Sequence, residues 1–111
     1  MGLLTFIAEL RATQLVDDMA KQVTRQVASL VRNACARRVA TMSHAEARGY
    51  LWAKARPMIS AEVRAIAVAQ PALRPLTLAA LSERAHDRIV HTVLAELMQE
   101  RTRYVGQRRA A

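Results

Sequence analysis

The chain has few of the residues that break helices and build turns, since its 111 residues include only three glycines and three prolines. Sheet proteins need more turn residues than this, so we predict an all-α protein. Aromatic residues are also scarce, and much of the 52% hydrophobic fraction is alanine. We therefore expect closely packed helices with few large side chains between them.

Cys35 is the only cysteine, so the chain cannot form an intramolecular disulfide, and we expect a cytoplasmic protein with a buried, unreactive thiol at this position. No apolar run approaches the ~18 residues that a membrane-spanning helix needs. The first ten residues lack a basic start and a small-residue cleavage site, so they do not resemble a signal peptide.

Sequence patterns for catalysis are also missing. The chain contains no glycine-rich phosphate loop, no nucleophile elbow, no cysteine–histidine pair at a useful spacing and no zinc-ligand spacing. We therefore expect a protein that is not an enzyme and that holds no cofactor.

Positive charge is the strongest compositional bias: the formal net charge is +8, and 15 of the 17 basic residues are arginine. A GC-rich genome would produce this bias without any function. Alternatively, the positive charge binds an anionic partner such as nucleic acid. We expect no aromatic side chain among the basic runs, so the second interpretation is limited to non-specific phosphate contacts. The candidate anion-binding residues are Arg32, Arg37, Arg38, Arg101, Arg103, Arg108 and Arg109.

Helix boundaries can be predicted from a few local signals. Ser43 and Glu46 have the spacing of a capping box, Pro71 and Pro75 bracket a short loop, and Gly106 is placed to end a helix. These signals predict one domain, residues 1–111, folded as a bundle of three to four helices. The predicted segments are a long first helix at 3–39, a helical region at 44–69 that either continues or breaks at Pro57, a last helix at 77–105, and a frayed basic tail at 107–111.

The first helix carries two apolar stripes. From Val16 to Ala34 the apolar residues follow three- and four-residue steps on one face, whereas a stripe near the N-terminus points about 130° away. Either the chain bends near residues 11–14, or residues 1–11 form an anchor segment that binds something other than this subunit's own core. A helix of about 37 residues would be roughly 55 Å long and would overhang a compact subunit, which favours an intertwined or otherwise oligomeric bundle.

The last helix has an apolar face about 200° wide, which one neighbouring helix cannot cover. This helix is therefore either central in its own bundle or shared with a partner subunit. The predicted interface residues from the two helices are Leu3, Phe6, Ile7, Leu10, Leu94 and Met98.

The segment SERAHDRIVH, residues 82–91, is the part of the sequence that most resembles a chemical site. Glu83, His86 and Asp87 share the apolar side of the helix, while His91 turns toward solvent. Glu83 and His86 have the Glu-x-x-His spacing of di-metal bundles, but one copy of this motif is a weak signal, so these three residues are only weak metal candidates. We expect an arginine or a neighbouring subunit to cover them, with a pH-sensitive interface role for His86 as a further alternative.

Together these patterns predict a non-enzymatic helical assembly protein that forms a homo-oligomer or serves as a small subunit of a larger complex. The alternative is an arginine-rich protein that binds nucleic-acid phosphates non-specifically. Attachment to a membrane surface is disfavoured, because the N-terminal apolar segment is short and carries Glu9.

Overall fold

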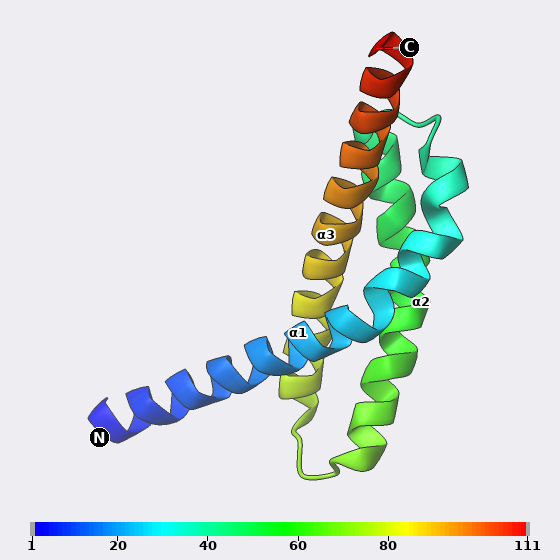
Figure 1. Cartoon of the computed structure of the whole chain (residues 1–111). Coiled ribbons are helices and arrows are strands. Elements are labelled where there is room, and N and C mark those ends of the chain that lie inside the picture. The colour runs from blue at the N-terminus through cyan, green and yellow to red at the C-terminus, as the bar shows by residue number, and fades with distance from the viewer. Residues whose placement is uncertain (1, 111) are drawn as a thin grey trace.

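The computed structural model describes the backbone of residues 2–110 and the side chains of residues 2–106. Within this range the chain is all-helical, with three helices that pack against one another (Figure 1). Helix α1 spans Gly2–Val39, α2 spans His44–Ala69 and α3 spans Pro75–Ala110. The predicted all-α class is confirmed, and three helices lie within the predicted range of three to four.

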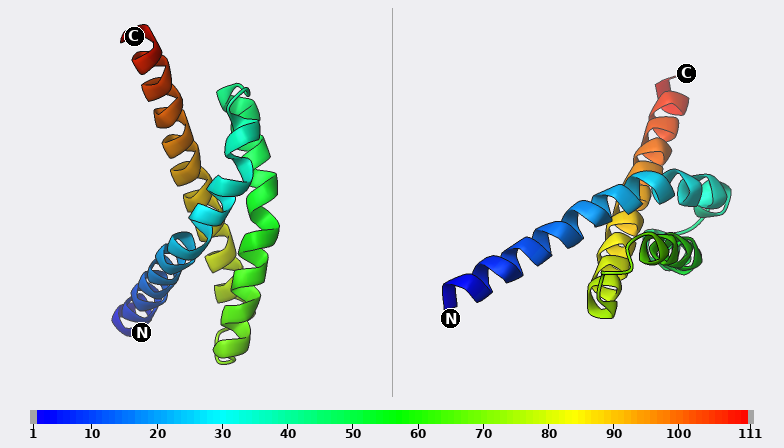
Figure 2. Two further views of the ribbon diagram at one scale, coloured as in Figure 1. Left: turned by 45° about the vertical axis from the view of Figure 1, so that its right-hand side comes forward. Right: turned by 90° about the horizontal axis from the view of Figure 1, so that it is seen from below.

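Helices α2 and α3 form an antiparallel pair, and the C-terminal half of α1 lies across that pair (Figure 1). The N-terminal half of α1 extends away from the other two helices, as both views in Figure 2 show. The molecule is therefore elongated, with dimensions of 65 × 29 × 20 Å.

The core is built from rows of residues four positions apart. Rows at this spacing run obliquely to the helix axis, so helices that pack through them cross at an angle, as α1 does against the α2–α3 pair. Fully buried alanines in the rows allow close approach of the helices. The main rows are Val23, Val27, Val31, Cys35 and Val39 in α1; Ala47, Leu51, Ala55 and Ile59 in α2; and Leu81, Ala85, Ile89, Val93 and Leu97 in α3.

The predicted capping box at the start of α2 is confirmed. The Glu46 backbone N–H donates to Ser43 Oγ at 3.2 Å, and the Ser43 backbone N–H donates to Glu46 Oε1 at 3.3 Å. Two N–H groups that a helix start leaves without partners are thereby satisfied. The local sequence thus determines where the chain turns from α1 into α2.

Pro57 does not break α2, which continues through it to Ala69. The buried residues Leu51, Ala55 and Ile59 keep their four-residue spacing on both sides of the proline, so packing holds the helix in register. Helix α3 begins at Pro75, two residues before the predicted start. The Leu78 N–H donates to the Arg74 carbonyl at 3.1 Å, which leaves Pro75 in the first helical turn, where a missing N–H has little cost.

The predicted helix end at Gly106 is wrong. The α3 backbone continues to Ala110, and none of the glycines in the described range has the positive φ of a helix-terminating residue. The predicted frayed tail, residues 107–111, has its side chains outside the described range. Among residues 2–110, no helix has the apolar length required to span a bilayer.

Candidate functional site

The projecting end of α1 is the first candidate surface, and we call residues 2–15 the α1 arm. Every residue of the arm is exposed, including Leu4 at 79% and Phe6 at 59%. At 100° per residue, four of the predicted interface residues lie within an arc of about 100°. These apolar-stripe residues are Leu3, Phe6, Ile7 and Leu10.

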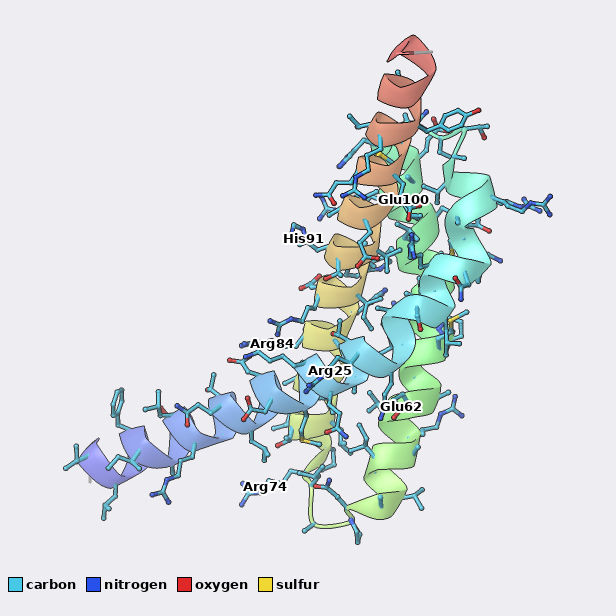
Figure 3. All side chains as sticks on the ribbon, viewed as in Figure 1. Arg25, Glu62, Arg74, Arg84, His91 and Glu100 are labelled. Carbon is cyan, nitrogen blue, oxygen red and sulfur yellow. The ribbon has the colours of Figure 1, made fainter. Side chains whose placement is uncertain are left out.

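The arm joins the body without a break in the helix. Val16 is the first buried residue, and an ion pair between Arg84 of α3 and Asp17 lies beside it (Figure 3). The predicted alternative of a bend near residues 11–14 that would turn the first stripe onto the core is therefore wrong. The apolar stripe of the arm covers no part of the chain's own core.

The other two predicted interface residues lie in a different environment. Leu94 is buried, and Met98 is half-buried against the core. Helix α3 contacts both α1 and α2, and two neighbours cover a face that one could not. Its wide apolar face is thus explained within a single chain, whereas the stripe of the arm is not.

The structure separates the three residues considered as weak metal candidates. His86 is buried at 7% exposure, whereas Glu83 and Asp87 are exposed, contrary to the expectation that all three share an apolar face. The His86 ring stacks on Trp52 of α2, with 3.7 Å between ring centroids and 29° between planes. His86 Nε2 lies 2.8 Å from the Trp52 backbone oxygen, and because a carbonyl only accepts, this nitrogen carries the hydrogen and donates it.

Trp52, rather than an arginine or a second subunit, thus covers His86, so the expected covering group is wrong for this residue. Within the described part of the chain, no group of three or more histidine, cysteine, aspartate and glutamate residues is arranged to hold a metal ion. What remains at this position is a fixed aromatic pair at the contact between α2 and α3.

Three adjoining hollows surround Trp52, and we call this region the Trp52 surface. One, of 290 Å³, lies toward Arg56, Glu83 and Asp87. A second, of 260 Å³, lies between α2 and α3 near Arg48 and His91. The third, of 530 Å³, opens over the outer side of α2 and is lined by His44, Ala45, Arg48, Gly49 and Trp52. An aromatic ring therefore does lie among basic side chains, contrary to our expectation.

The predicted anion-binding arginines do not form one surface. Arg32 forms ion pairs with Glu96, at 3.6 Å, and with Glu100. Arg101 donates from Nη1 to the Met42 carbonyl at 2.8 Å and so helps to hold the α1–α2 corner. Arg37, Arg38 and Arg103 are exposed, and the side chains of Arg108 and Arg109 lie outside the described range.

Arg101 and Arg103 also border a cleft of 540 Å³ between the C-terminal parts of α1 and α3, which includes Val39, Leu97 and Met98.

Cys35 lies in the buried row of α1 with no exposed surface. Burial raises the pKa of its thiol above the ordinary value, and nearby Lys54 partly offsets this effect. A thiol with a raised pKa and no access to solvent is not a nucleophile.

The chain matches no protein-family model, and comparison with curated proteins and with solved structures finds no significant similarity. Function must therefore be argued from the surfaces themselves. Sequence reasoning identified the stripe of the arm and missed the Trp52 surface. The signal for the latter was the four-residue spacing of His44, Arg48, Trp52 and Arg56, which places all four on one side of α2.

Proposed function

We propose that this protein is a non-enzymatic helical assembly protein whose α1 arm binds a second copy of the chain or another subunit of a larger complex. The observation that carries the proposal is the apolar stripe of the arm, which is exposed although it lies on an ordered helix. A cytoplasmic setting belongs to the proposal, since the lone cysteine offers no intramolecular disulfide.

The energetics of an exposed helix end support a bound partner. The arm continues a helix that is already formed in the core, so it needs no nucleation of its own, but helical hydrogen bonding alone adds little stability to residues outside the core. Every residue from 2 to 15 is exposed, and six of them have large apolar side chains: Leu3, Leu4, Phe6, Ile7, Leu10 and Leu15. A partner covering the stripe would supply the missing burial, at roughly 25 cal/mol per Å² of apolar surface.

The shape and charge of the molecule support self-association. Its radius of gyration is 17.4 Å, compared with about 13 Å for a compact chain of this length. Within the arm the charges of Glu9 and Arg11 cancel, whereas the whole chain carries +8. An apolar arm without net charge can therefore pack against another copy without the repulsion that two basic surfaces would meet.

A matched pair of double variants tests the proposal. Phe6→Glu with Leu10→Glu places two carboxylates on the apolar stripe, and Ala8→Glu with Ala12→Glu places two at the same spacing on the opposite side of the arm. By light scattering, we expect the wild-type chain to have a mass that is a multiple of 12.3 kDa. The stripe variant should fall to 12.3 kDa, while the control should keep the wild-type mass.

Amide hydrogen exchange completes the test. In the assembled wild type, amides of the arm should be protected, and this protection should disappear in the stripe variant while that of α2 and α3 remains. A wild-type chain that is monomeric at all concentrations, with an arm that exchanges freely, would contradict self-association.

A further inference from the structure

Trp52 lies in the middle of a basic row on α2. His44, Arg48 and Arg56 share its side of the helix at four-residue steps, so consecutive side chains are about 6 Å apart along the axis. Within the described part of the chain, neither Arg48 nor Arg56 is held in an ion pair. One aromatic ring thus has a guanidinium group one turn before it and another one turn after it.

The indole is fixed in place but only partly covered. His86 stacks on the ring and hydrogen-bonds to the Trp52 carbonyl, yet 39% of the residue remains exposed. On the outer side of α2, Ala45 and Gly49 are small, and a Cβ added to Gly49 would meet no atom within 4 Å. The 530 Å³ hollow over Gly49 therefore gives a flat ligand access to the indole.

The charges around the ring differ between its two sides. Between the helices, Glu83 and Asp87 of α3 border one hollow together with Arg56, and Asp87 also borders the second one together with Arg48. The hollow over α2 has no acidic residue in its lining, which includes Arg48 and His44. A phosphate beside Arg48 can accordingly lie over the outer side of α2, away from the two carboxylates, whereas a phosphate beside Arg56 lies nearer to them.

We propose that the Trp52 surface binds single-stranded nucleic acid, with a base stacked on Trp52 and the flanking phosphates in contact with Arg48 and Arg56. A fixed aromatic platform between cationic side chains is the arrangement by which proteins bind single strands with little sequence preference. A duplex keeps its bases paired and stacked, so it cannot use the platform. The net charge of +8 adds long-range attraction for any polyanion.

This site lies on α2, whereas the α1 arm belongs to another helix. The proposal therefore goes beyond the assembly function and can be tested independently of it.

The probes are a ten-nucleotide oligothymidine and the matching oligouridine. Trp52 is the only tryptophan, so its fluorescence reports this surface alone. We expect both strands to quench it at low salt and to bind more weakly as salt rises, and a preference between them would identify DNA or RNA as the ligand.

Variants locate the contact, with binding followed by the anisotropy of a labelled strand. Trp52→Ala should weaken binding about 5- to 160-fold, which corresponds to about 1–3 kcal/mol for one stacked base. Arg48→Gln with Arg56→Gln should weaken it and reduce the slope of affinity against salt, by about one per lost phosphate contact. The matched control, Arg25→Gln with Arg74→Gln, removes the same charge from exposed positions elsewhere (Figure 3) and should weaken binding much less.

Asp87→Asn provides a test of opposite sign, because removing a carboxylate near the ring should strengthen binding. Equal losses in the two arginine double variants would overturn the proposal, since binding would then follow net charge alone. Tighter binding of the duplex form, or no quenching by either strand at low salt, would overturn it as well. Each comparison can be repeated with Phe6→Glu and Leu10→Glu present, so that assembly and strand binding are measured independently.

Discussion

The environment of Cys35 suppresses the nucleophilic reactivity that an exposed thiol would have. Cys35 lies in the row of α1 between Val31 and Val39, and all three residues are buried. Burial stabilises the neutral thiol relative to the thiolate, which is why the pKa rises despite the nearby Lys54. The prediction from sequence of a buried, unreactive cysteine agrees with this environment.

We expect the native thiol to react with an aromatic disulfide reagent at least about 100-fold more slowly than the thiol of the chain unfolded in urea at the same pH. Between pH 7 and 9 the unfolded thiol gains thiolate first, because its pKa is the lower of the two. The ratio of the two rates should therefore be largest near pH 7 and should narrow as the pH rises through the pKa of the unfolded thiol. Reaction of the native chain at the unfolded rate would show that Cys35 is accessible.

At the same scale, the neighbours of His86 show where prediction from sequence reached its limit. A helical wheel gives the direction of a side chain and not its depth, so Glu83, His86 and Asp87 were placed together. Depth depends on the neighbouring helix, and Trp52 of α2 covers His86 alone. That pairing joins residues 34 positions apart, and nothing in the local sequence indicates it.

Among the elements, α2 contains a proline in its interior, Pro57, and also has the clearest start signal, the capping box of Ser43 and Glu46. Its capping box was predictable because both partners lie within four residues of each other. Continuation through Pro57 was not predictable, because it depends on Ile59 and Ala55 packing against other helices. The same limit applies to Gly106 of α3, where a local signal for a helix end was present and the helix continues.

Pro57→Ala should stabilise the chain by about 1–3 kcal/mol, measured by urea unfolding. Alanine restores an N–H that can donate to the Ala53 carbonyl and removes the clash of the proline ring with that turn. Part of this gain is offset because alanine raises the conformational entropy of the unfolded chain, which proline restricts. Gly49→Ala is the matched comparison in the same helix and should add roughly 0.5–1 kcal/mol. Destabilisation by Pro57→Ala would instead mean that packing requires the proline geometry.

At the scale of the whole molecule, the apolar residues of α1 divide into two groups with different roles. Most of those from Val16 onward form the core with α2 and α3, with Leu30 as an exposed exception, and those of the arm are all exposed. The sequence predicted this division through the change of face between the two stripes. It did not predict which alternative would apply, because a continuous helix and a bent one carry the same pattern.

Val23→Asp should unfold the chain, seen as loss of helical circular dichroism and of a cooperative transition. The side chain is fully buried, and an unpaired charge there costs several kcal/mol against a total stability of about 5–15 kcal/mol. Gln22→Asp, one residue earlier on the exposed side, should leave the fold intact. A folded Val23→Asp chain would show that this row is not the core.

Because α1 is a single helix from Gly2 to Val39, the arm and the core segment belong to one stiff rod rather than to two parts joined by a tether. A partner that holds the arm therefore fixes the direction of the whole bundle as well as its position. Torque applied at the arm would be carried directly to the Val23–Val39 contacts with the other helices. Attachment through this arm would thus set the angles of an assembly as well as its composition.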